Sequence, residues 1–553
     1  MNRQVFPLAV CVMLFAGCST AKFKADADKE AYEIIRQKER IVMGVERPFS
    51  IDRESGDPLL GLPLVRPEPL GNLEGEDAVL LSLAQAVEIA TANNREYQSR
   101  MEDVYLGALD LSLARYRWAP IFSGNLSTTY TNAPGTETVS GQGNAGLSWL
   151  LPDGTQLGLK ISTDYLLKLI GSPREAAASL ITATLTKPLW RGAGKRIAQE
   201  NLLQAERDMV YRIRTFARYR RTFAITVASQ YYRVLQQRDS VMNAWNNYQN
   251  LIVGRERSEM LAEAGRLPGF EVDQARQSEL SAQDRYVRAI QSYQQSLDQL
   301  KIRLGLPTDA AIQLDPADIT SMRDQGIIHP DLNFEDAIDI ALAARLDLAN
   351  TLDQVADAAR KVEVAENGLV PDVQLVLSSS VPTSDSNNNP LDFRPNDARY
   401  SAGLDVEIPF DRKQERNTYR RTLISFDRSK RDASLAIDNV KLEVRDAWRK
   451  LEEARASYEI QRISLELAEK RVRSTTLLLD AGRASTRDLL EAQDSLLEAQ
   501  NSLTRTIVDH TIARLEFWRD IGILEIDEKG LWQEDFETFT NGQENEFPEN
   551  NVQ

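Results

Sequence analysis

The sequence predicts a mainly helical protein with a small β part, in which long antiparallel coiled-coil helices and about four strands form an internal two-fold repeat. Three observations support this fold class. The stretch from Asp411 to Ala481 contains neither proline nor glycine. Short segments elsewhere alternate apolar and polar residues, as strands with two different faces do. Similar segments recur at fixed spacings, which is the signature of a repeated architecture.

Composition and length restrict the function. The chain has 553 residues, more than one compact core usually organises, and 82 acidic against 66 basic residues give it a net charge of -16. This charge disfavours a nucleic-acid partner. No run of 18 or more apolar residues predicts a membrane-spanning helix.

Residues 1–17 are predicted to be a secretory signal, because basic Arg3 is followed by an apolar stretch and by small residues before Cys18. Ala-Gly-Cys resembles a bacterial lipobox, although Phe15 stands where that motif usually has leucine. We therefore expect lipidation of Cys18, with ordinary cleavage as the alternative. Residues 18–80 are then an N-terminal extension, and the mature chain has no second cysteine for a disulfide.

Two copies of one layout occupy most of the chain. Ala86 corresponds to Ala337 and Pro120 to Pro371, both 251 residues apart. The predicted division is a first helix-strand-strand-helix repeat over 81–304, a linker over 305–331, a second repeat over 332–524 and an acidic tail over 525–553.

Each copy contains two alternating segments. Residues 121–131 place Phe122, Leu126 and Tyr130 opposite serines, asparagine and threonine, and residues 400–408 alternate in the same way. Such strands fit a transmembrane barrel, but an antiparallel sheet of a soluble domain alternates identically. Two strands per copy cannot close a barrel within one chain, so either oligomers complete it or the barrel interpretation fails. Whether the insert 132–178 adds wall strands or an external hairpin stays open.

The helices are long. The stretch from Asp411 spans about 105 Å at 1.5 Å per residue, and it keeps an apolar seam with coiled-coil spacing. A similar helix is expected over 197–262 in the first copy. Two shorter helices, predicted over 83–118 and 335–369, are about half as long.

The turns between long helices are similar in the two copies. Ala-Gly-Arg precedes an acid six residues past the glycine, Glu271 after Gly265 and Asp488 after Gly482. The glycines permit tight turns. Glu491 follows Asp488 by three residues and therefore shares its helical face.

These features together resemble the TolC-type outer-membrane channel proteins, including lipid-anchored members. The resemblance covers about 81–524 and includes KPLWRGAGKRIAQ and IPFDRKQERN, which follow the second strand of each copy. It implies a homotrimer in which each chain gives four strands to one shared transmembrane β-barrel in the outer membrane. The long helices would continue the barrel as a periplasmic tunnel.

The resemblance also assigns roles at the doubled turn. Asp488 and Glu491 match acids of the family's periplasmic gate, and Glu271 and Asp273 occupy the corresponding turn of the first copy. The docking of an adaptor protein at the tip is implied for the two turns themselves, Gly265 with Arg266 and Gly482 with Arg483. The alternative is that all of these are solvated charges and simple turns on a coiled-coil exterior.

The implied function is a passive conduit in a tripartite efflux or type I secretion system, with an inner-membrane transporter and a periplasmic adaptor as partners. Its rival is a periplasmic coiled-coil structural lipoprotein without a pore. An enzyme is not expected, because His329 and His510, the two histidines, show no spacing typical of a metal site or a catalytic triad. We expect no catalytic residue, metal or cofactor.

Overall fold

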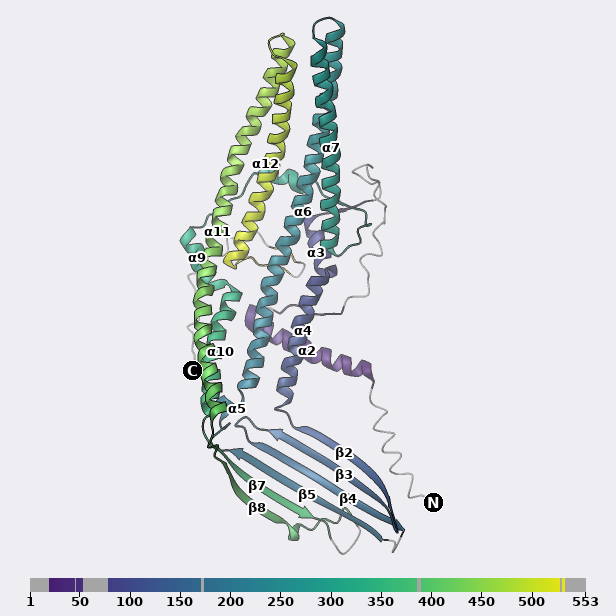
Figure 1. Ribbon diagram of the computed structural model, residues 1–553, viewed down its shortest axis with the longest axis vertical. Helices are drawn as coiled ribbons and strands as arrows, with labels where there is room; N and C mark the ends of the chain where they lie inside the picture. Colours follow the sequence, from purple (N-terminus) through teal and green to yellow (C-terminus); the bar gives the residue numbers. More distant parts are fainter. Residues whose placement is uncertain are drawn as a thin grey trace. The chain divides into compact units, whose positions relative to one another are not determined.

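The computed structural model describes residues 19–44, 46–52, 78–170, 174–384, 389–527 and 530–532. The signal segment 1–17, Cys18 and most of the tail 525–553 lie outside these residues. The chain divides into two compact units. Figure 1 labels the helices and strands of both. Unit 1 contains the described parts of Met1–Phe49, Asp103–Arg214 and Ala349–Leu435; unit 2 contains those of Ser50–Glu102, Thr215–Leu348 and Ala436–Gln553.

Four helices contribute residues to both units: α4 (Arg95–Tyr116), α6 (Glu200–Glu263), α10 (Leu346–Asn367) and α11 (Lys413–Asp480). Helix α11 has 68 residues, in agreement with the expected long helix. The other elements of unit 1 are α2 (Thr20–Met43), β2 (Ile121–Ala133), β3 (Thr136–Leu150), β4 (Gln156–Ile170), β5 (Arg174–Pro188), α5 (Lys195–Ala198), β7 (Asp372–Pro382), η1 (Pro395–Asp397) and β8 (Arg399–Glu407). The other elements of unit 2 are β1 (Val79–Leu81), α3 (Leu83–Asn93), α7 (Gly269–Leu304), β6 (Ile312–Leu314), α8 (Ala317–Gln325), α9 (Phe334–Ala344) and α12 (Thr486–Ile521).

The sheet of unit 1 has six strands in the order β2-β3-β4-β5-β7-β8, and every neighbouring pair is antiparallel. The expectation of about four strands is therefore wrong. The insert 132–178 forms β3 and β4, which hydrogen-bond between β2 and β5 and extend the sheet. Turns at Pro134-Gly135 and Asp153-Gly154 allow this, since both glycines have positive φ.

The two faces of this sheet differ in polarity. Paired residues of an antiparallel sheet lie on the same face, so the pairing follows one face across the strands. Phe122 pairs with Leu147, Leu147 with Leu159, and Leu159 with Ala183, all apolar. On the opposite face, three residues along β2 from Phe122, Asn125 pairs with Asn144 and Asn144 with Ser162, all polar. The predicted alternation is confirmed and extends over all six strands.

A buried ionic cluster joins α6 to α10 in unit 1. The Asp357 carboxylate, which is 2% exposed, accepts hydrogen bonds from the Tyr211 hydroxyl at 2.6 Å and from Arg207 at 2.7 Å, and Arg360 lies 2.9 Å away. Burial alone would raise the pKa of Asp357, but these partners hold it below its ordinary value. Its contribution to stability is thus present above pH ~4 and is lost as the pH falls further.

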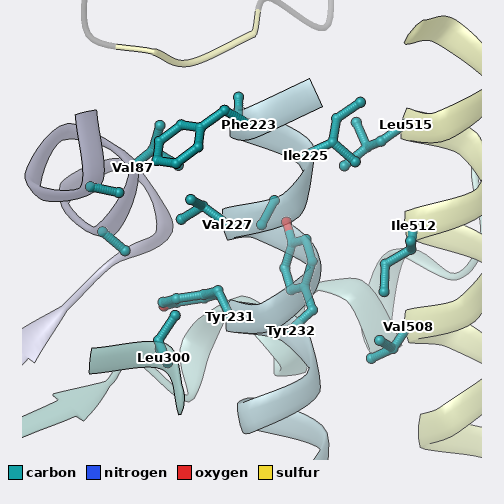
Figure 2. Close-up of a cluster of buried hydrophobic side chains, with 14 of the residues drawn as sticks. Val87, Phe223, Ile225, Val227, Tyr231, Tyr232, Leu300, Val508, Ile512 and Leu515 are labelled. Carbon is teal, nitrogen blue, oxygen red and sulfur yellow. The ribbon is translucent and has the colours of Figure 1, made fainter. Parts of the chain in front are cut away.

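The main apolar core lies in unit 2, where α3, α6, α7 and α12 contribute side chains (Figure 2). Tyr231 of α6 is fully buried, and its hydroxyl lies 2.7 Å from Asp318 Oδ2 and 3.0 Å from the Leu81 carbonyl oxygen. Asp318 belongs to α8 in the linker, and Leu81 ends β1, which pairs in parallel with β6 of the linker. The Tyr231 hydroxyl therefore has hydrogen-bond partners although it is buried, and it connects the linker to α6.

The predicted short helices each break once. Helices α3 and α4 are separated at Asn94, and α9 and α10 at Arg345; both residues have extended backbones. Each side chain donates to a carbonyl near the end of a long helix, Asn94 to Arg303 at 2.8 Å and Arg345 to Asp520 at 3.4 Å. The two contacts occupy equivalent positions of the two copies. Asn94 and Arg345 are separated by the same 251 residues as Ala86 and Ala337, and Arg303 and Asp520 by the same 217 residues as the turn glycines Gly265 and Gly482.

Two helices end in glycine where the backbone passes close to the helix breaks at Asn94 and Arg345. Gly305 ends α7 with φ +75, and a Cβ there would lie 2.5 Å from the Asn93 carbonyl oxygen. Gly522 ends α12 with φ +87, and its Cβ would lie 3.2 Å from the Ala344 carbonyl oxygen. A side chain is thus excluded by backbone conformation and by crowding at Gly305, and mainly by conformation at Gly522.

Candidate functional site

The doubled turn closes two helical hairpins of unit 2, α6–α7 and α11–α12. Gly265 and Gly482 have φ of 70 and 68, and each is followed by an arginine whose backbone N–H reaches back into the preceding helix. Arg266 donates to Leu261 and Arg483 to Leu478, both at 2.8 Å. This is the Schellman ending of a helix, in which a left-handed residue terminates the last turn. Gly265, Gly482 and both arginine side chains are exposed.

The acids of the motif occupy the third position of the helix that follows each turn, Glu271 in α7 and Asp488 in α12. A carboxylate in the first turn faces the unpaired N–H groups and the positive end of the helix dipole. Asp488 Oδ2 accepts from the backbone N–H of Ser485 at 2.9 Å, and Ser485 Oγ accepts from the Asp488 N–H at 3.3 Å. These hydrogen bonds lower the pKa of Asp488. Its carboxylate is exposed and anionic.

The first copy uses its acid differently. Pro268 precedes α7 and has no side-chain group to form the reciprocal cap. Glu271 instead reaches the other hairpin, where its Oε2 accepts a hydrogen bond from Thr486 Oγ1 at 2.8 Å. Thr486 is the first residue of α12 and is buried. Glu271 is half-buried, whereas Asp273 is exposed.

Glu491 is exposed and lies on the same side of α12 as Asp488, one turn along. Its carboxylate is 3.1 Å from an Arg471 nitrogen of α11, the other helix of its own hairpin. The structure therefore places Asp488 and Glu491 as two accessible carboxylates on α12. Of the four predicted acids, Glu271 is the one that forms a hydrogen bond between the two hairpins.

Further contacts between the hairpins were not predicted from the sequence. Leu490 packs against Leu251 of α6 and Ala282 of α7. Arg285 of α7 lies 2.8 Å from Asp494 of α12. In addition, Arg257 of α6 forms an ion pair with Asp480, the last residue of α11. Helical periodicity predicts that these charged side chains face solvent. It does not predict which charged residue of the other hairpin each one pairs with.

The polar face of the sheet is a second candidate surface. It carries a hollow bordered by Ser127, Gln142 and Asp164 from three adjacent strands. Gln142 Nε2 donates to Asp164 Oδ1 at 2.9 Å. This face can contact water or polar solutes, and the opposite face offers apolar side chains.

The two histidines meet in unit 2. Their rings lie 5.9 Å apart, and His329 Nε2 is 3.1 Å from a Glu452 carboxylate oxygen. His510 is 1% exposed, and within the described part of the chain its Nε2 has no hydrogen-bond partner. Burial, with smaller contributions from His329, Arg514 and Arg455, lowers the pKa of His510 to about 4.

Unit 2 should therefore lose stability as the pH falls from about 6.5 to about 4. Over this window the unfolded chain binds a proton at His510 that the folded chain does not, so the free energy of unfolding decreases by roughly 3 kcal/mol. Substitution His510→Gln should flatten this part of the curve in thermal denaturation measured at several pH values. An equal pH slope in parent and variant would show that another group is responsible.

No described helix has the length and apolar content needed to cross a membrane. Within the described ranges, no three histidine, cysteine or acidic side chains lie close enough together to hold a metal ion.

Comparisons with known proteins agree with this architecture. Residues 337–514 match the outer membrane efflux protein family. No curated relative matches the chain. The fold is similar to that of the CmeC outer membrane channel of Campylobacter jejuni, at 14% identity over 83% of this chain and 88% of that one, with a TM-score of 0.58.

Two further solved structures are similar. The outer membrane protein VceC of Vibrio cholerae shares 14% identity over 80% of this chain and 96% of that one, with a TM-score of 0.59. The MtrE outer membrane channel of Neisseria gonorrhoeae, solved in its open state, shares 12% identity over 80% and 89%, with a TM-score of 0.57. At these identities the likeness establishes the fold.

Proposed function

Because its residues 337–514 match the outer membrane efflux protein family, we propose that it is the outer-membrane channel component of a tripartite efflux or type I secretion system. The protein is a passive, non-enzymatic conduit that crosses the outer membrane and extends into the periplasm. It works as a homotrimer, receives cargo from an inner-membrane transporter, and docks a periplasmic adaptor at its helical turns.

The observation that carries this proposal is the sheet of unit 1. One face is apolar and the other polar. Large side chains of the apolar face are exposed: Phe122 is 78% and Tyr400 is 80% exposed. A soluble monomer has no reason to present such a face to water. In a membrane wall the apolar face contacts lipid and the polar face lines an aqueous lumen. Lipidation at Cys18 adds an anchor to the same membrane.

The two hairpins supply the periplasmic end. Three chains would bring Asp488 and Glu491 into rings around the threefold axis, and rings of carboxylates attract cations and resist closure through mutual repulsion. Glu271, through Thr486, would connect neighbouring hairpins, and Asp273 would add charge beside it. Gly265, Arg266, Gly482 and Arg483, exposed at the turns, would form the adaptor surface.

The double variant Asp488→Asn/Glu491→Gln should conduct with a weaker preference for cations. Asparagine keeps the oxygen that caps α12, so the helix start is retained while the charge is lost. In planar bilayers under a salt gradient, we expect the permeability ratio of cations to anions to fall about twofold or more. The matched control Asp446→Asn/Glu466→Gln removes two exposed charges of α11 that each pair within their own helix.

The control should keep the parent selectivity. If the two double variants behave alike, Asp488 and Glu491 do not form the gate. If the parent protein gives no conductance at all, the channel proposal is wrong, and the non-channel structural lipoprotein becomes the better account.

A further inference from the structure

Among the described residues, the sheet of unit 1 ends in two unpaired edges. Strand β2, with 13 residues, and strand β8, with 9, each pair there on one side only. Side chains along β8, and along β2 beyond its first residue, are exposed. Long exposed edge strands bind other strands, and natural proteins cover or pair them. In lipid this requirement is absolute, because no water satisfies an open edge.

A second copy of the same sheet fits these edges. Six strands that alternate in direction leave β2 and β8 antiparallel to one another. The β2 of one copy can therefore continue the antiparallel ladder beyond the β8 of another. The polarity also continues, because Phe122 on β2 and Tyr400 on β8 lie on the same apolar face: pairing leads from Phe122 through β3, β4, β5 and β7 to Tyr400.

The strands are also staggered as a closed barrel requires. The row of paired residues that starts at Ile121, the first residue of β2, reaches Ser378 on β7 and Ser401 on β8, five interstrand steps away. Strand β7 begins six residues earlier at Asp372, which pairs with Glu407 at the end of β8. Six residues of stagger across five interstrand steps correspond to about 20 Å along the strands and about 24 Å across them. The resulting tilt of about 40° is typical of membrane barrels.

From these observations we infer that the β3–β4 hairpin is a wall element that widens the pore, and that three copies of the six-stranded sheet join edge to edge into one eighteen-stranded barrel. The inference rests on the proposed trimeric channel. It differs from the twelve strands that the family resemblance implies.

The added strands change the bore. At a strand spacing of about 4.8 Å and a tilt of about 40°, eighteen strands form a ring about 36 Å across, and twelve form one about 24 Å across. Three copies of the two hairpins supply twelve long helices, and at a helix spacing of about 9 Å these form a ring about 35 Å across. The wider barrel would therefore match the helical tunnel, whereas the narrower one would constrict it.

The chain provides a direct test by deletion of residues 136–173, which removes β3 and β4. Strand β2 then leads through the existing Pro134-Gly135 turn into β5, with Ala133 facing Arg174. In that register Leu126 lies opposite Ile181, so the apolar faces still coincide. We expect a trimer of twelve strands whose single-channel conductance in planar bilayers is two- to threefold lower than that of the parent.

Equal conductance in the parent and the deletion variant would show that the hairpin lies outside the wall and would overturn the inference. Electron cryomicroscopy of the full-length trimer provides an independent count if the variant does not fold. Eighteen strands support the inference, and twelve strands, from two chains or three, overturn it. Absence of conductance in the parent itself would refute the channel proposal rather than the role of the hairpin.

Discussion

Gly305→Ala should destabilise unit 2 by about 3 kcal/mol or more. The backbone at Gly305 has φ +75, which costs a residue with a side chain roughly 1–2 kcal/mol. In addition, the new Cβ would lie 2.5 Å from the Asn93 carbonyl oxygen, which belongs to backbone and cannot rotate away. Relief requires α7 to separate from the end of α3, next to the partly buried Asn94–Arg303 hydrogen bond. Hydrogen exchange followed by mass spectrometry should show protection in α3 and at the end of α7 reduced more than a hundredfold.

Gly265→Ala is the matched control. Gly265 has nearly the same φ, +70, but no atom lies within 4 Å of its Cβ position. The variant should therefore lose only the conformational term, about 1–2 kcal/mol, and the loss should stay within the α6–α7 turn. Equal effects of the two substitutions would show that conformation alone matters and that the close approach to Asn93 contributes nothing.

Arg257→Gln/Arg285→Gln should raise the open probability of the channel roughly ten- to hundredfold. The two arginines form ion pairs with Asp480 and Asp494 and hold the α6–α7 hairpin against α11–α12. Exposed pairs of this kind contribute about 0.5 kcal/mol each. Three subunits would carry six such links, so their joint loss shifts the equilibrium between closed and open tips substantially. Single-channel recording at moderate ionic strength measures this shift, and high salt should reduce the difference from the parent.

The control for this pair is Arg288→Gln/Arg462→Gln. These arginines are exposed, and their partners Asp284 and Glu459 lie on the same helices as the arginines themselves. The control removes the same charge without removing a link between hairpins, so its open probability should equal that of the parent. A similar increase in both variants would attribute the effect to net charge instead.

The repeat and the position of the turn acids could be predicted from the sequence, because both depend on local residue types. Gly482 and Asp488 illustrate this: a left-handed helix end needs glycine, and the first helical turn favours an acid. Local residue types did not predict that the Glu271 carboxylate, instead of capping its own helix, accepts a hydrogen bond from Thr486 of the other hairpin. Proline at position 268 removes the cap, and only the fold brings the other hairpin within reach.

Two features of the fold were not predictable by the same means. The breaks at Asn94 and Arg345 interrupt helical patterns that continue in the sequence, because each side chain is drawn to a carbonyl of a distant helix. The strand content was underestimated because β3 is rich in glycine and polar residues. Gly141, Gly143 and Gly146 weaken the alternation in β3, and pairing on both sides compensates for this.

The central claim is that one chain cannot seal its own wall and that copies must join through the edges of their sheets. The mass of the purified protein in detergent, determined by light scattering with the detergent contribution subtracted, tests this most directly. A complex of three chains is the predicted result. A stable single chain, with β2 and β8 unpaired in solution, would contradict it.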